Sequence, residues 1–140
     1  MDNSPRNIVF DLLLDFLSSN RSFKSIIEQK FKKINQLSNI DKSFIINISK
    51  GVLRYKKVLD FNISNYSKVK KIDNKTLVLL YVGSYQLLYC DGVPNYAAVD
   101  TTIELSKLRH KRSAKFINAI LRKIEKSPFK INHNSNNKDF

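Results

Sequence analysis

Glycine and proline are scarce in this sequence, while apolar residues recur at helical spacing along almost its whole length. The 140 residues contain three glycines and three prolines. Few positions therefore interrupt a helix, and the alternation of apolar and polar residues that marks a half-buried strand is hard to find. The pattern predicts an all-α fold in a single domain.

Helix start signals and apolar spacing divide the chain into seven predicted helices. Ser4 followed by Pro5 starts the first, because proline is favoured at the first helical position. Asp41 and Asp73 are the expected N-caps of the third and fifth. The expected helices cover residues 4–20, 22–34, 41–53, 58–66, 73–89, 94–108 and 113–125. The polar composition that follows predicts a domain over residues 1–126 and a disordered tail over residues 127–140.

The fifth predicted helix, residues 73–89, is the most apolar and is expected to lie at the centre of the fold. Gly51 and Gly83 lie inside predicted helices, which indicates close approach of another helix at each. Leu108 is expected to face the core, and Asn118 to be buried and bonded to backbone groups. Four apolar residues are expected to pack the seventh helix onto the fifth: Phe116, Ile117, Ile120 and Leu121.

Several features predict a cytoplasmic protein without a membrane segment. The apolar run over residues 77–89 is interrupted by Ser84 and Gln86 and is too short to cross a bilayer. Asp11 and Asp15 interrupt the first apolar stretch, so no secretory signal is expected. Cys90 is the only cysteine, which excludes an internal disulfide and suits a reducing compartment.

The sequence contains no pattern typical of catalysis or cofactor binding. Its three glycines are isolated and form neither a phosphate-binding nor a dinucleotide-binding loop. His110 and His133 have no carboxylate close to them in the sequence. Asp100 and Glu104 can share one face of a helix, which we interpret as a solvated face or a partner contact. We therefore expect no catalytic residue, no metal site and no cofactor.

The excess of positive charge points to a polyanionic partner. The formal net charge is +13, and residues 105–130 carry nine basic side chains against one acid, Glu125. Lys115, Arg122 and Lys126 are expected on the face of the seventh helix opposite its apolar stripe. A basic stripe of this kind can follow a phosphate backbone. The alternative is an ordinary solvated face in a lysine-rich protein.

Two basic groups supply the candidate RNA contacts. One lies in the predicted link 109–112 and the helix after it, and the other follows the third predicted helix, where Tyr55 can stack on a base. The candidate residues are Arg54, Lys56, Arg109, Lys111, Arg112, Lys115 and Arg122. For Arg54 and Arg122, a buried ion pair with Asp100 or Glu104 is the alternative interpretation.

Four segments resemble the NusB fold family, and they occur in the family's order and spacing. The first two are Asp41-Lys42 with Gly51-Val52-Leu53-Arg54, and Leu80 and Gly83 with Tyr85-Gln86-Leu87-Leu88-Tyr89. The others are Val93-Pro94-Asn95-Tyr96-Ala97-Ala98-Val99-Asp100 with Thr102-Ile103-Glu104-Leu105-Ser106-Lys107, and Lys115-Phe116-Ile117-Asn118-Ala119-Ile120-Leu121-Arg122. The resemblance covers residues 5–126 and implies an RNA-binding bundle of about seven helices in two subdomains.

Two branches of that family imply different roles. One is the transcription antitermination factor, which binds boxA-type RNA together with a ribosomal-protein partner, NusE. The other is the N-terminal domain of a small-subunit rRNA 5-methylcytosine methyltransferase, RsmB. The strings at residues 51–54 and 116–122 are more similar to the RsmB branch. Antitermination factors usually begin their first helix with several arginines, whereas this chain has only Arg6 there.

The resemblance therefore implies a domain that positions small-subunit rRNA and has no catalysis of its own. The S-adenosylmethionine-binding domain and catalytic cysteine of RsmB cannot fit after Lys126, so we expect a truncated or split product, a fragment, or a stand-alone relative. A methyltransferase domain is the partner in that role. The alternatives are an antitermination factor with a NusE-like partner, and a protein-interaction domain without RNA that uses Asp100, Glu104 and the apolar edge of the sixth helix.

Overall fold

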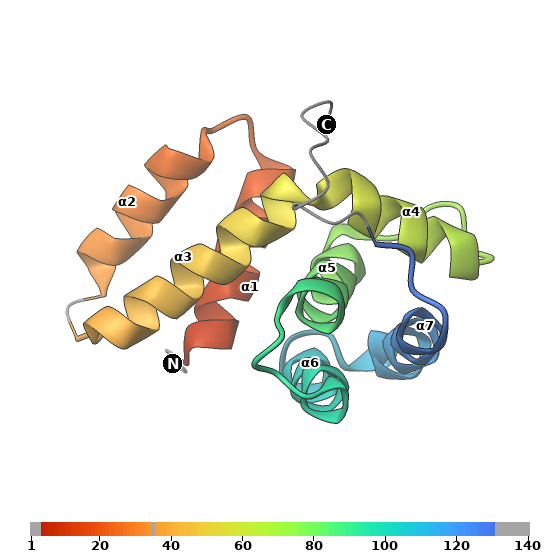
Figure 1. Ribbon diagram of the computed structural model, residues 1–140. Helices are drawn as coiled ribbons and strands as arrows, with labels where there is room; N and C mark the ends of the chain where they lie inside the picture. The colour runs from red at the N-terminus through yellow and green to blue at the C-terminus, as the bar shows by residue number, and fades with distance from the viewer. Residues whose placement is uncertain (1–3, 35, 131–140) are drawn as a thin grey trace, which may run out of the picture.

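Seven α-helices and one short 3₁₀ turn make up the computed structural model, which describes residues 4–34 and 36–130 (Figure 1). They are α1 (Pro5–Ser18), α2 (Phe23–Lys33), α3 (Asn39–Arg54), α4 (Lys56–Tyr66), α5 (Asn74–Tyr89), α6 (Asn95–Arg109), the 3₁₀ turn η1 (Lys111–Ser113) and α7 (Ala114–Lys126). The described residues contain no strand. The prediction of an all-α fold with about seven helices is confirmed.

Capping explains where the helices begin. Ser4 is the N-cap of α1 with Pro5 directly after it, as predicted. Asp73 is the N-cap of α5, and its Oδ2 accepts a hydrogen bond from the Thr76 backbone at 3.2 Å. The predicted start of the third helix is wrong, because Ser38 is its N-cap and accepts from the Asp41 backbone at 3.0 Å. Both residue types favour this position, and the helix begins at the earlier one.

Helix α5 lies at the centre and joins two groups of helices. It packs against α1 and α3 on one side and against α4, α6 and α7 on the other. Figure 1 shows α1, α2 and α3 grouped at one end of the molecule and α4, α6 and α7 at the other. Val78, Leu79, Leu80 and Val82 are buried because α5 is covered almost all round. The predictions of two subdomains and of a central fifth helix are confirmed.

Two glycines allow helices to approach closely, as predicted. The ring of Tyr85 occupies the space where a Cβ at Gly51 would lie. A Cβ at Gly83 would be 2.7 Å from Cδ1 of Leu121 and 3.1 Å from Oγ1 of Thr102. Gly83 thus marks the point where α5, α6 and α7 meet, and the expected packing of α7 onto α5 is confirmed.

Two predictions about the core are wrong. Asn118 is exposed, because the inward stripe of α7 is formed by Ile117, Ile120, Leu121 and Ile124 and residue 118 falls just outside it. Leu108 is 57% exposed near the end of α6. One of the buried amides is that of Asn62 in α4. It donates to the Val58 carbonyl at 2.9 Å and exchanges two hydrogen bonds with the Phe129 backbone.

The chain after α7 remains in contact with the fold up to the last described residue. The Tyr66 hydroxyl donates to the Ser127 carbonyl at 2.5 Å, and the rings of Phe61 and Phe129 lie 4.7 Å apart. Residues 131–140, the rest of the predicted tail, are outside the described residues. In the part of the chain that the structure describes, no helix is both long and apolar enough to cross a membrane.

Candidate nucleic-acid interface

A row of exposed cations runs along η1 and the outward face of α7. The inward face of α7 is apolar and buried, so the polar positions at helical spacing all face solvent. We call the row the cationic strip; it consists of Lys111, Arg112, Lys115, Arg122 and Lys126, all exposed. At 1.5 Å per residue, the α7 part from Lys115 to Lys126 extends about 16 Å.

Serine hydroxyl groups hold the turn that starts this strip. The carbonyl of His110 accepts from the Ser113 backbone at 3.1 Å, from the Ser113 hydroxyl at 2.9 Å and from the Ser106 hydroxyl at 3.2 Å. The two hydroxyl oxygens are also 3.2 Å apart. These bonds join the end of α6 to the start of α7 and fix the backbone that carries Lys111 and Arg112.

A second basic segment lies beside η1. We call it the lysine-rich loop; it is the α4–α5 connection, residues 67–73, with Lys68, Lys70 and Lys71 exposed. The Ser67 hydroxyl bonds with both backbone groups of Val69, at 2.9 and 3.1 Å. This loop is not among the predicted basic groups, although its three lysines within residues 68–71 form a local charge excess that is visible in the sequence.

A histidine and a carboxylate connect the loop to the turn. Nε2 of His110 lies 3.1 Å from Oδ2 of Asp73, close enough for an ion pair. The same nitrogen is buried and makes no aligned hydrogen bond within the described residues, so we treat the contact as electrostatic. His110 has no carboxylate close to it in the sequence. Folding brings Asp73 to it from a distant part of the sequence.

The Asp73 carboxyl ionises more readily than an ordinary aspartate. Burial acts to raise its pKa, but hydrogen bonds from the Thr76 hydroxyl and backbone, together with the charge of His110, outweigh burial and lower the pKa overall. The hydroxyl bond measures 2.8 Å. Asp73 is thus a carboxylate at neutral pH, and both of its oxygens are already in use.

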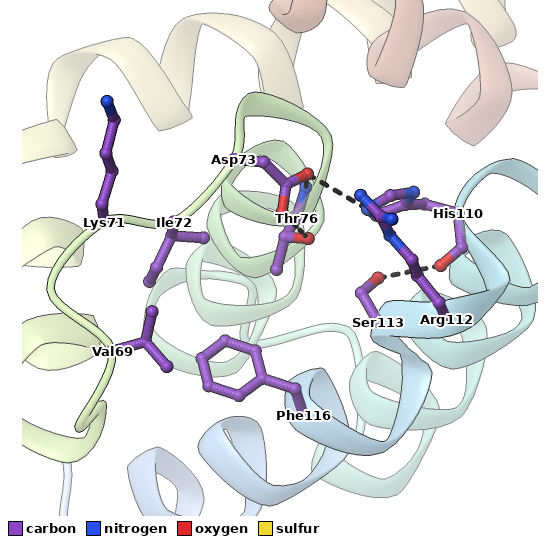
Figure 2. A pocket seen from close by; sticks show the side chains of 9 residues that line it. All are labelled: Val69, Lys71, Ile72, Asp73, Thr76, His110, Arg112, Ser113 and Phe116. Atoms are coloured by element: carbon purple, nitrogen blue, oxygen red, sulfur yellow. Dashed lines mark hydrogen bonds and ion pairs between the residues drawn. The ribbon is translucent and has the colours of Figure 1, made fainter.

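A pocket of about 330 Å³ lies between the lysine-rich loop and η1. We call it the loop–turn pocket; it is lined by Val69, Lys71, Ile72, Asp73, Thr76, His110, Arg112, Ser113 and Phe116. Figure 2 shows the ring of Phe116 directed toward Val69 and Ile72, with Arg112 and His110 across from the loop near Asp73. The pocket therefore combines an apolar wall with cations.

Arg109, one of the predicted RNA contacts, is used inside the fold. Its guanidinium donates to Oδ1 of Asp11 at 2.6 Å and to the side chain of Asn7, and it lies 4.4 Å from the centre of the Phe10 ring. All three partners belong to α1. We therefore assign Arg109 a structural role between α6 and α1.

The second predicted basic group lies on different elements, at the junction of α3 and α4. Nζ of Lys56 is 2.9 Å from Oδ2 of Asp60, so this cation is already paired. The ring of Tyr55 stacks on Tyr89 with centroids 3.9 Å apart. This group therefore lies on elements other than η1 and α7, which carry the cationic strip.

The alternative of a buried ion pair for two of the arginines is wrong. Arg54 and Arg122 are exposed. Arg122 contacts Glu125 at 3.5 Å, and neither Asp100 nor Glu104 forms an ion pair within the described residues. Both arginines therefore remain accessible to a ligand.

Other candidate chemistry is sparse in the described part of the chain. It holds no group of three His, Cys, Asp or Glu side chains that could bind a metal. His133 lies outside the described residues. Burial, with Asp91 nearby, raises the pKa of the half-buried Cys90 thiol, which favours its unreactive protonated form.

Comparison with known proteins agrees with this architecture. The pattern of the NusB family matches residues 3–126. A protein described as a probable ribosomal RNA small subunit methyltransferase B from Bacillus subtilis (strain 168) is 29% identical over 125 residues, covering 88% of this chain and 28% of that protein. The transcription antitermination protein NusB of Clostridium tetani (strain Massachusetts / E88) is 31% identical over 126 residues, which cover 84% of this chain and 82% of that protein. The transcription antitermination protein NusB of Arthrobacter sp. (strain FB24) is 26% identical over 124 residues, which cover 86% of this chain and 89% of that protein.

The chain thus spans less than a third of the methyltransferase and most of each antitermination protein. The family match extends over all of the residues that form α1 to α7. This chain belongs to the NusB family.

Proposed function

We propose that this chain is an RNA-binding domain of the NusB type and that the cationic strip and the lysine-rich loop hold small-subunit rRNA. One observation carries the proposal: two basic segments far apart in the sequence lie beside one another at η1. Arg112 and Lys71 line the same pocket, one from each segment. Such a surface favours a ligand with many closely spaced phosphates.

The proposed role is that of the N-terminal part of an RsmB-like methyltransferase, which would present rRNA to a methyltransferase domain. That domain would supply the chemistry, because we assign no catalytic residue to this chain. The similarity to the Bacillus subtilis protein supports this role. We expect the chain to act in the cytoplasm.

Antitermination is the second candidate, with boxA-type RNA and a NusE-like ribosomal protein as partners. The match covers 82% of the Clostridium tetani antitermination protein, which favours this role. The contacts at the N-terminus of α1 argue against antitermination. The Arg6 guanidinium donates to Oε1 of Gln86 at 3.0 Å and lies 5.0 Å from the centre of the Phe44 ring. Burial lowers the pKa of Arg6, and its side chain is occupied within the fold.

The test compares two variants with the same change of charge. One carries Lys111→Glu, Arg112→Glu and Lys115→Glu in the cationic strip. The control carries Lys24→Glu, Lys32→Glu and Lys33→Glu, three exposed residues of α2 at the other end of the molecule (Figure 1). Fluorescence anisotropy gives the affinity for a small-subunit rRNA hairpin and for a boxA-type single strand.

The strip variant should lose at least about tenfold in affinity, while the control should lose much less because its charges lie away from the bound phosphates. Preference of the wild type for the hairpin supports the rRNA role, and preference for the single strand supports antitermination. Equal losses in the two variants would contradict the assigned surface. Failure of the wild type to bind either RNA would favour a protein-interaction domain instead.

A further inference from the structure

The loop–turn pocket has a feature that phosphate binding does not require. Its floor is apolar, formed by Phe116, Ile72 and Val69, and Val69 is 51% exposed. Ile72 and Phe116 are half-buried beside it. An apolar floor with cations at the rim suits a ligand that has a flat or apolar part as well as a negative charge.

Two cations at the rim of the pocket supply positive charge for such a ligand. Arg112 and Lys71 are exposed on opposite sides of the pocket, one on η1 and the other on the lysine-rich loop. His110 also lines the pocket, and its Nε2 lies 3.1 Å from Oδ2 of Asp73. The positive charge available to a phosphate therefore comes from Arg112 and Lys71.

We infer that the loop–turn pocket receives one unpaired nucleotide of RNA, with its base against Phe116 and Ile72 and its phosphate at Arg112 and Lys71. The inference rests on the proposed function and narrows the class of RNA. Bases within a continuous A-form duplex are stacked and cannot enter a side pocket, whereas bulged, looped or single-stranded bases can stack on aromatic side chains. The volume of about 330 Å³ lies within the range of small-molecule sites.

The pocket should accept different bases with similar affinity. Asp73 already accepts hydrogen bonds from the Thr76 backbone and hydroxyl. The Ser113 hydroxyl is used by the His110 carbonyl. Few groups remain to read the edge of a base, so stacking dominates, and stacking tolerates any base because each has a flat π face.

Three short RNA duplexes test this inference directly. They share one sequence and differ at a single position: fully paired, with one bulged nucleotide, or with one bulged abasic nucleotide. The wild-type protein should bind the bulged duplex about fivefold or more tighter than the other two, because stacking of one base on an aromatic ring contributes about that much. Replacing the bulged base with each of the other three should change the affinity less than removing it.

A matched pair of variants locates the effect. Phe116→Leu keeps an apolar side chain but removes the aromatic ring, and should abolish the preference for the bulged duplex over the paired and abasic duplexes. Phe61→Leu makes the same replacement at an exposed ring of α4 outside the pocket and should keep the preference. Circular dichroism checks that both variants are folded.

A fluorescent base at the bulge, 2-aminopurine, gives a second readout in the wild type, since stacking on Phe116 should quench it. Equal affinity for all three duplexes, or a preference that survives Phe116→Leu, would overturn the pocket assignment and leave the proposed function standing. Binding to none of the three duplexes or to the RNAs used above would overturn both.

Discussion

The guanidinium of Arg109, the last residue of α6, donates a 2.6 Å hydrogen bond to the carboxylate of Asp11 in the middle of α1. The side chains are 26% and 28% exposed, so water screens the pair only partly. Asp11 also lies 3.3 Å from Nζ of Lys30 in α2. The pair therefore joins the two groups of helices through an arginine that the charge pattern alone assigns to RNA contact.

Replacing Arg109 should affect stability more than RNA binding. Arg109→Ala leaves Asp11 and Asn7 without their charged donor and should lower the free energy of unfolding by about 1–3 kcal/mol. Arg109→Lys should restore only part of the lost free energy of unfolding. An ammonium lacks the planar fork by which a guanidinium bonds to both partners. Urea unfolding measures the change, with exposed Lys107→Ala as the control. A stable Arg109→Ala variant that has lost RNA affinity would contradict the structural role.

A methyl group at Gly51 should destabilise the fold despite the helical position. Gly51→Ala gains helix propensity of about 1 kcal/mol, but the new Cβ overlaps the ring of Tyr85, which must move. Overpacking of this kind costs about 1–3 kcal/mol, so we expect a net loss of stability. Gly92→Ala is the matched control, because a Cβ there meets no atom within 4 Å. A Gly51→Ala variant as stable as Gly92→Ala in thermal unfolding would show that Tyr85 adapts without cost.

Helix positions could be predicted from the sequence because they depend on local patterns. Apolar spacing and capping residues act over a few neighbours in the sequence. Ser4 and Asp73 are the N-caps of α1 and α5, as the sequence predicts. Asn118 was misplaced because the width of a buried stripe depends on which helix packs against it. The burial of Asn62 could not be predicted, since its partner Phe129 lies in a distant segment.

The stability contributed by Asp73 should depend on pH. Its pKa is lowered in the folded state, so its contribution is present above the unfolded value, about 3.9, and is lost as the pH falls through the folded pKa. Asp73→Asn retains a helix cap but removes the charge. The variant should unfold at a lower temperature than the wild type at pH 7, and this difference in unfolding temperature should decrease below about pH 4. A difference that stays constant between pH 7 and pH 3 would show that the charge of Asp73 does not contribute to stability.

Loosening the turn at η1 should weaken RNA binding without removing a charge. Ser113→Ala deletes the hydroxyl that bonds to the His110 carbonyl and should reduce affinity several-fold, because Lys111 and Arg112 are then less well positioned. The dependence of affinity on salt should stay the same, since the number of cations is unchanged. The exposed hydroxyl of Ser64 provides the control, Ser64→Ala. A change in salt dependence in Ser113→Ala would contradict a purely positional effect.

The candidate interface was predictable only in part. Exposure of Lys115, Arg122 and Lys126 follows from their place opposite the apolar stripe of α7, which the sequence displays. The internal use of Arg109 depends on where α1 lies, which no local pattern gives. Lys56 and Asp60 are four residues apart on α4, so their pairing follows from helical spacing once that helix begins at residue 56 instead of the predicted 58. The loop–turn pocket depends on bringing Lys71 next to Arg112, and no local pattern encodes that contact.

The most direct test of the account is the salt dependence of RNA binding in the wild type and in a neutralised variant, Lys111→Gln, Arg112→Gln and Lys115→Gln. Each phosphate neutralised by the protein contributes about 0.7–0.9 to the slope of log affinity against log salt. We expect a steep wild-type slope that falls by about 2–3 in the variant. A shallow wild-type slope, or the same slope in both proteins, would show that these cations do not bind the RNA backbone.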